Sequence, residues 1–132
     1  VLCNRYVPAN LAHQGSKLPS EAERRAFFEW VARLEYGILE LPRPDLHILL
    51  EMPPEAAMRL VRERGSRTAG PPQGRDIHEA DPGHLQATAA TYRQVAGETS
   101  GTWAVIACRH GGAVLPRDEI AGKVWAEVRK IL

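Results

Sequence analysis

The residues best suited to chemistry stand near the start of the chain, where an apolar run turns abruptly polar. Residues 1–3 are typical of a buried strand, and Asn4 and Arg5 follow them directly. In an open α/β sheet, ligand-binding side chains lie at the carboxyl ends of strands. The guanidinium of Arg5 presents a planar set of donors that suits a phosphate. We therefore predict an anion-binding position at Arg5, with a solvated arginine in an ordinary polar loop as the alternative.

Two amide side chains follow this position. Pro8 is well placed to open a helix, because its fixed backbone angle suits the first helical turn. Asn10 and Gln14 would then lie four residues apart on one helical face. Side-chain amides carry both donors and acceptors and can bind the edge of a nucleobase through paired hydrogen bonds. The pattern thus predicts a nucleotide site.

Residues 4–14 resemble the Asp-Arg-Tyr segment of thymidylate kinases. Three further segments resemble that family in the same order: Leu-Pro-Arg-Pro-Asp-Leu at 41–46, Met-Pro-Pro-Glu at 52–55 and Asp-Ile-His-Glu at 76–79. Four matches in the right order are far more specific than any one of them. The resemblance covers nearly the whole chain. It implies phosphoryl transfer from MgATP to dTMP on a partial P-loop NTPase fold, with a parallel sheet between two helical layers (α/β/α).

The resemblance also assigns roles around dTMP. By matching positions, Arg5 would hold the phosphate, and Asn10 and Gln14 would bind the thymine edge. His13 would pack beside the deoxyribose. Asn4 stands where the family usually has Asp, so a carboxylate that could assist Mg²⁺ or orient Arg5 is replaced by an amide. We count Asn4 among the substrate-binding residues and expect its effect to fall on rate and metal geometry.

A basic segment between residues 62 and 75 is interrupted by glycines and prolines, which favours a loop. Phosphoryl transfer needs positive charge and exclusion of water at the transferring group, and a closing loop with arginines supplies both. With the resemblance, Arg62, Arg67 and Arg75 become candidate catalytic lid residues; without it, a solvated loop is the simpler interpretation. The resemblance implies that three residues at the end of the lid border the sugar or brace these arginines: Asp76, His78 and Glu79.

The loop after the strand at 102–108 is the candidate ATP-contacting element. Arg109, Gly111 and Gly112 stand at the carboxyl end of that strand, and in related kinases this loop borders adenine. The resemblance implies that Mg²⁺ is held mainly by ATP and by a phosphate loop. We predict no protein metal site. Four residues crowd together without clean metal-binding spacing and form a weaker alternative: His78, Glu79, Asp81 and His84.

A phosphate-binding loop of the form Gly-x-x-x-x-Gly-Lys-Ser/Thr does not occur in the 132 residues. In thymidylate kinases this loop precedes the Asp-Arg-Tyr segment. We therefore expect residues 1–132 to form one domain that corresponds to the C-terminal part of such a kinase, lacks the N-terminal P-loop segment and is inactive alone.

Composition limits the partners of the chain. Its 17 basic and 16 acidic residues argue against a general nucleic-acid coat or a polybasic membrane anchor. No apolar run approaches the ~20 residues of a membrane span. Cys3 and Cys108 both stand in apolar, strand-like settings and are expected to be buried thiols in a reducing cytoplasm.

The remaining pattern alternates strands with helices, which predicts a parallel sheet with right-handed crossovers. Ser20 and Glu23 form a capping box before a helix of about 18 residues. Its apolar stripe should face the sheet or serve a homodimer, and consists of Phe27, Trp30, Val31, Leu34 and Ile38. The other expected elements are a central strand at 46–52, a helix from Pro54 to Gly65, a helix after Asp81, the strand at 102–108 and a helix from Pro116 with Ile120, Val124, Val128 and Leu132 inward.

Two other classes of function fit parts of the sequence. A kinase-derived binding or regulatory domain could keep the nucleotide pocket and lose catalysis, which Asn4 makes plausible. A nucleic-acid-binding module could use the arginine-rich segment, although the chain lacks interleaved aromatic residues and a basic net charge.

Overall fold

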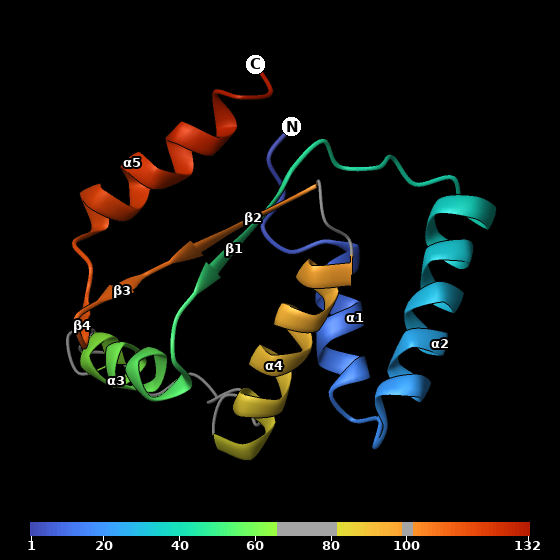
Figure 1. The fold of residues 1–132 in the computed structure, drawn as a ribbon, viewed down its shortest axis with the longest axis horizontal. Coiled ribbons are helices and arrows are strands. Elements are labelled where there is room, and N and C mark those ends of the chain that lie inside the picture. Colours follow the sequence, from blue (N-terminus) through green and yellow to red (C-terminus); the bar gives the residue numbers. More distant parts are fainter. Residues whose placement is uncertain (66–81, 99–101) are drawn as a thin grey trace.

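The computed structural model describes residues 1–65, 82–98 and 102–132. Two parallel strands, β1 (His47–Glu51) and β2 (Trp103–Ala107), pair in register from His47 opposite Trp103 to Glu51 opposite Ala107 (Figure 1). The expected mixed α/β class with parallel strands is confirmed. Within the described residues β1 pairs only with β2, so the expectation of a central strand at 46–52 is not met here.

The opening residues differ from the prediction. Residues 1–6 form no strand, Val1 and Leu2 are fully exposed, and Cys3 is exposed as well. A strand needs a neighbour that accepts and donates its backbone hydrogen bonds, and no described strand pairs with this segment. An apolar run alone therefore did not decide strand formation. The thiol of Cys108 is buried as expected.

The core lies where α1 (Val7–Gly15) packs against α2 (Glu21–Ala32) and α4 (Pro82–Glu98), as Figure 1 shows beside the two strands. Pro8 stands in the first turn of α1, as predicted. Five buried residues form the main apolar cluster: Val7, Leu11, Phe28, Val31 and Val95. Thus the helices, rather than the two-stranded sheet, supply most of the buried apolar surface described.

Gly15 allows α1 and α2 to approach closely. A Cβ atom at Gly15 would lie 2.8 Å from Cε1 of Phe28 and 3.4 Å from Cγ2 of Thr91. We expect Gly15→Ala to lower the free energy of unfolding by about 1–3 kcal/mol, because the ring must shift within a packed core. Urea unfolding measures this. Gly97→Ala is the matched control, since nothing lies within 4 Å of a Cβ there; equal stability of the two variants would contradict the prediction.

The helix that begins at the capping box was predicted correctly in place but only partly in orientation. Ser20 and Glu23 make both capping hydrogen bonds, and α2 continues into a π-helical turn, η1 (Arg33–Ile38). Phe28 and Val31 are buried, whereas Trp30 is 53% and Ile38 73% exposed. The buried face is set by packing on α1 and α4, so only part of the predicted stripe points inward.

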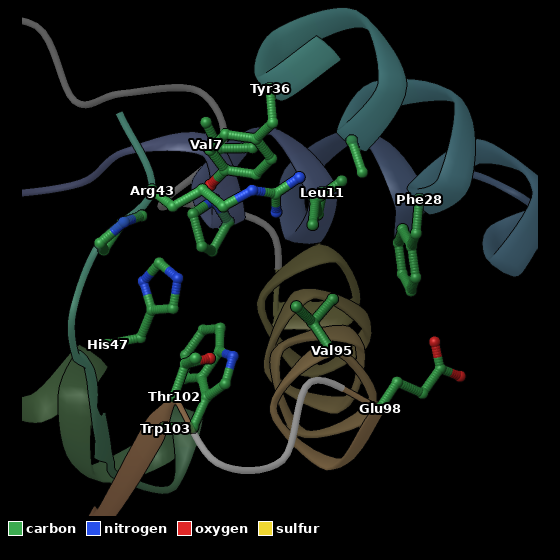
Figure 2. A pocket seen from close by; sticks show the side chains of 13 residues that line it. Val7, Leu11, Phe28, Tyr36, Arg43, His47, Val95, Glu98, Thr102 and Trp103 are labelled. Atoms are coloured by element: carbon green, nitrogen blue, oxygen red, sulfur yellow. The ribbon is translucent and has the colours of Figure 1, made fainter. Parts of the chain in front are cut away.

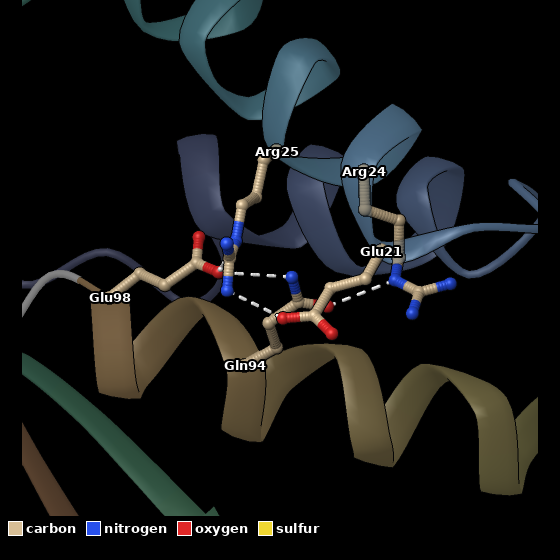
Figure 3. Close-up of polar contacts among 5 residues, drawn as sticks. All are labelled: Glu21, Arg24, Arg25, Gln94 and Glu98. Carbon is tan, nitrogen blue, oxygen red and sulfur yellow. Dashed lines mark hydrogen bonds and ion pairs between the residues drawn. The ribbon is translucent and has the colours of Figure 1, made fainter.

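Polar contacts join α2 to α4 along their exposed side (Figure 3). Arg25 binds Glu21 at 2.6 Å and Glu98 at 3.0 Å. Nε of Arg24 donates to Oε1 of Gln94 at 2.9 Å, and Gln94 in turn donates to Glu98. These exposed contacts fix the register of the two helices more than they add stability.

The remaining helices follow the expected order, and a short hairpin takes the place of the expected loop after β2. These elements are α3 (Pro54–Gly65), the short antiparallel strands β3 (Arg109–His110) and β4 (Ala113–Val114), and α5 (Arg117–Val128). Ile120, Val124 and Val128 are half-buried in α5, which packs on β2, but Leu132 lies beyond the helix and is exposed. No helix among the described residues is long and apolar enough to cross a membrane.

Candidate functional site

Arg5 holds an unusual backbone conformation at the entrance to α1. Its φ angle of +68° lies in the left-handed region, which residues with a side chain seldom adopt. Such strain persists only where the surrounding structure enforces it and is concentrated at functional sites. Burial raises the pKa of the Tyr92 phenol on α4, and the positive charge of Arg5 opposes this rise. The positive charge of Arg5 therefore interacts electrostatically with Tyr92 on α4.

His13 lies on α1 beside two rings from α4. Its ring centroid is 6.1 Å from that of Tyr92, in an edge-on arrangement, and 6.1 Å from that of His84. Nε2 of His84 lies 3.4 Å from the hydroxyl of Thr88. The packing of α1 on α4 thus gathers a guanidinium, two imidazoles and a phenol. We call Arg5, His13, His84 and Tyr92 the α1–α4 cluster.

Two members of this cluster were not predicted as nucleotide-site residues. His84 was named only in the weaker metal alternative, and Tyr92 was not among the candidate site residues. A signal was present: His84, Thr88 and Tyr92 repeat every four residues and so share one helical face. What the sequence could not supply is that this face lies against His13.

The two predicted amides lie on α1 with defined partners. Nδ2 of Asn10 donates to Oε1 of Glu35 on η1 at 3.1 Å. Oε1 of Gln14 accepts from Nζ of Lys17 at 3.1 Å. Among the described residues, the carbonyl oxygen of Asn10 and the NH₂ group of Gln14 have no partner in these two contacts and remain as an acceptor and a donor. Asn4 is exposed just before Arg5.

The predicted lid falls outside what the structure describes. This applies to Arg67, Arg75, Asp76, His78 and Glu79, and to the side chain of Arg62, whose backbone belongs to α3. Among the described residues, no group of three or more His, Cys, Asp or Glu side chains could hold a metal ion. Of the residues named for the metal alternative, only His84 lies in the described part of the chain.

The glycine loop after β2 is a tight hairpin turn. Gly111 and Gly112 have φ angles of +55° and +91°, as a two-residue turn between antiparallel strands requires. A Cβ at Gly112 would lie 3.7 Å from a terminal nitrogen of Arg109, so the guanidinium reaches over the turn. In Figure 1 the hairpin lies at the end of β2 and well apart from α1. The hairpin and the α1–α4 cluster are thus two separate candidate regions.

A cavity of about 300 Å³ lies elsewhere, on another face of α1 (Figure 2). None of the predicted site residues lines it. Val7, Pro8 and Leu11 of α1 contribute to its wall, together with residues around the starts of β1 and β2.

Comparison with curated proteins finds relatives that share one name. No protein-family profile matches the chain. Thymidylate kinase of Mycobacterium tuberculosis is 36% identical over 107 residues, which cover 80% of this chain and 49% of that enzyme. Thymidylate kinase of Thermomicrobium roseum is 30% identical over 135 aligned positions, which cover the whole of this chain and 55% of that enzyme. The chain thus spans about half the length of these two curated relatives.

Proposed function

The chain is homologous to thymidylate kinases over about half of their length, and from this we propose that it forms the dTMP-binding and lid portion of such a kinase. The reaction is phosphoryl transfer from MgATP to dTMP, giving dTDP. The fold would be part of a P-loop NTPase, with the phosphate loop supplied by sequence outside these 132 residues. The observation that carries the proposal is the strained Arg5 beside α4, within the segment that resembles the family's Asp-Arg-Tyr motif.

The α1–α4 cluster suits a nucleoside monophosphate. Arg5 would bind the phosphate through its planar donors, and its left-handed backbone would keep the guanidinium directed to one side of α1. His13 and Tyr92, arranged edge-on, would flank the deoxyribose and exclude water from it. This arrangement orients the acceptor phosphate, which is the main task of a protein in phosphoryl transfer.

Recognition of thymine would use the amides of α1. The contact with Glu35 leaves the carbonyl of Asn10 as an acceptor for the N3–H of thymine. The contact with Lys17 leaves the NH₂ of Gln14 as a donor to a thymine carbonyl. Neighbouring acceptor and donor groups complement the N3–H and O4 edge of thymine. Adenine also presents a donor beside an acceptor, at N6–H and N7, so the expected discrimination against AMP follows from the homology to thymidylate kinases and not from these amides.

MgATP, when bound, supplies the phosphoryl group, and its Mg²⁺ balances the negative charge of the phosphates. Of the described residues, Arg109, Gly111 and Gly112 would border its adenine, since the hairpin stands at the carboxyl end of a parallel strand. Arg62, Arg67 and Arg75 are proposed to close over the phosphates. We propose that Asp76, His78 and Glu79 border the sugar or hold these arginines in place.

A coupled ADP-release assay on the full-length gene product tests the proposal. With MgATP, turnover is expected with dTMP and, more slowly, with dUMP, but not with AMP. If the folded protein binds dTMP without releasing ADP, the nucleotide pocket serves a binding or regulatory role, which Asn4 would favour. Turnover with AMP in preference to dTMP would refute the assigned acceptor.

We also propose that the protein forms a homodimer through the exposed aromatic face of α2. Phe27 and Trp30 stack there with centroids 6.1 Å apart, and Trp30 is 53% exposed. Phe27 is partly buried against the core, so it supports the exposed Trp30, and an exposed tryptophan is typical of interface centres.

Trp30→Glu is expected to weaken the dimer at least about 30-fold, because a charge would be buried in place of an aromatic anchor. Sedimentation equilibrium measures the dissociation constant. Trp125→Glu, at an equally exposed tryptophan of α5, is the control and should leave the dimer intact. A wild-type protein that is monomeric at high concentration would contradict the proposal.

A further inference from the structure

The cavity beside α1 is separate from the nucleotide site and has its own chemistry. It lies between α1, α2, η1, the end of α4, the segment before β1 and the starts of β1 and β2 (Figure 2). Its volume of about 300 Å³ is at the lower end of the range found for small-molecule sites. Leu11, Phe28 and Val95 form an apolar floor drawn from the core cluster. The cavity can therefore hold a ligand of one or two rings.

One wall of the cavity carries a cation that has no anionic partner among the described residues. The guanidinium carbon of Arg43 lies 4.5 Å from the centroid of the Tyr36 ring. No carboxylate of the described residues forms an ion pair with Arg43. The one carboxylate in the lining, Glu98, is held by Arg25 at 3.0 Å and by Gln94. A guanidinium fixed over an aromatic ring and lacking a counter-ion favours an anionic ligand.

The opposite wall is aromatic. His47 and Trp103 face each other across the two strands with ring centroids 4.7 Å apart and an interplanar angle of 31°. Burial lowers the pKa of His47, so its imidazole is neutral at pH 7 and adds no second charge. Figure 2 shows the rings of His47 and Trp103 below Arg43 and Tyr36. Arg43 therefore lies above two uncharged rings, and the negative charge of Glu98 in the lining is already paired with Arg25.

We propose that this cavity binds a small planar aromatic carboxylate, with the carboxylate on Arg43 and the ring system against Trp103 and His47. A single guanidinium matches a single carboxylate in charge and geometry. The aromatic rings contribute offset stacking with the ligand. This inference does not rest on the proposed kinase function, because the cavity contains none of the residues assigned to nucleotide binding.

Titration calorimetry of the full-length gene product with 2-naphthoate tests the proposal. Arg43→Met keeps the length and apolar bulk of the side chain but removes its charge, and is expected to weaken binding about 10- to 100-fold. Arg59→Met, which removes an exposed arginine of α3, is the matched control and should bind as the wild type does. The neutral analogue 2-naphthamide lacks the carboxylate charge. Its affinity for the wild type should therefore be no higher than the affinity of 2-naphthoate for Arg43→Met.

Three results would overturn the proposal. The first is no binding of 2-naphthoate to the folded protein at millimolar concentration, as when another segment of the full-length product fills the cavity. The second is equal affinity in wild type and Arg43→Met. The third is loss of binding in Arg5→Ala with Arg43→Met unaffected, which would place the ligand at the nucleotide site. A Trp103→Leu variant that still folds and binds 2-naphthoate at full strength would remove the stacking part of the proposal.

Discussion

Replacing Arg5 with alanine is expected to lower kcat/KM for dTMP about 100-fold in the full-length gene product. The loss corresponds to about 3 kcal/mol, the scale of a charge-assisted, two-point contact with phosphate. Because the arginine is proposed to hold the acceptor in line for transfer, kcat should fall together with a rise in KM. Steady-state ADP release at a series of dTMP concentrations measures both kcat and KM.

Two further variants test whether the loss is specific to the guanidinium group of Arg5. Arg5→Lys should recover only part of the activity, since an ammonium cannot reproduce the planar fork. Arg59→Ala removes an exposed arginine of α3 whose contact with Glu63 is 3.8 Å long, and should leave kcat/KM unchanged. Full activity in Arg5→Ala would show that the left-handed conformation of this residue does not serve phosphate binding.

Replacing Phe28 with alanine should produce the largest loss of stability of any change considered, about 3–5 kcal/mol in the free energy of unfolding. The side chain is 8% exposed and belongs to the cluster that joins α1, α2 and α4. Its Cε1 atom is also the one that a Cβ at Gly15 would meet, so the ring fills the space between the two helices. Removing it leaves a cavity that neighbouring helices cannot close without losing their other contacts.

Urea unfolding followed by circular dichroism measures this effect. Trp125→Ala provides the control, because Trp125 is a larger aromatic residue but 54% exposed on α5, and its replacement should cost less than about 1 kcal/mol. Similar losses in the two variants would mean that Phe28 is not part of the central packing.

The local elements could be predicted because their signals are short-range. Ser20 and Glu23 satisfy the first turn of α2 through their own side chains. Pro8 and Pro54 begin helices because proline suits the first turn and has no donor to lose there. Gly111 and Gly112 allow positive φ angles without steric cost. None of these effects needs a distant neighbour.

The faces of the elements could not be predicted in the same way. Helical spacing predicted one apolar stripe that includes Trp30, Val31 and Ile38. Packing against α1 and α4 buried Val31 of this stripe together with Phe28, which lies outside it, whereas Trp30 and Ile38 are exposed. Periodicity reports that a helix is amphipathic over a broad arc, and the partner decides which part of that arc is covered. The opening apolar run likewise needed a pairing strand, and no described strand accepts it.

The candidate site shows the same division. Residue types singled out Arg5, Asn10 and Gln14 as candidate ligand-binding residues, and the resemblance to thymidylate kinases added His13 and the expected nucleotide. Only the tertiary structure placed His84 and Tyr92 beside His13 and opened a cavity at Arg43. The physical reason is that chemical type is a property of single residues, whereas proximity between α1 and α4 depends on how the helices between and around them pack.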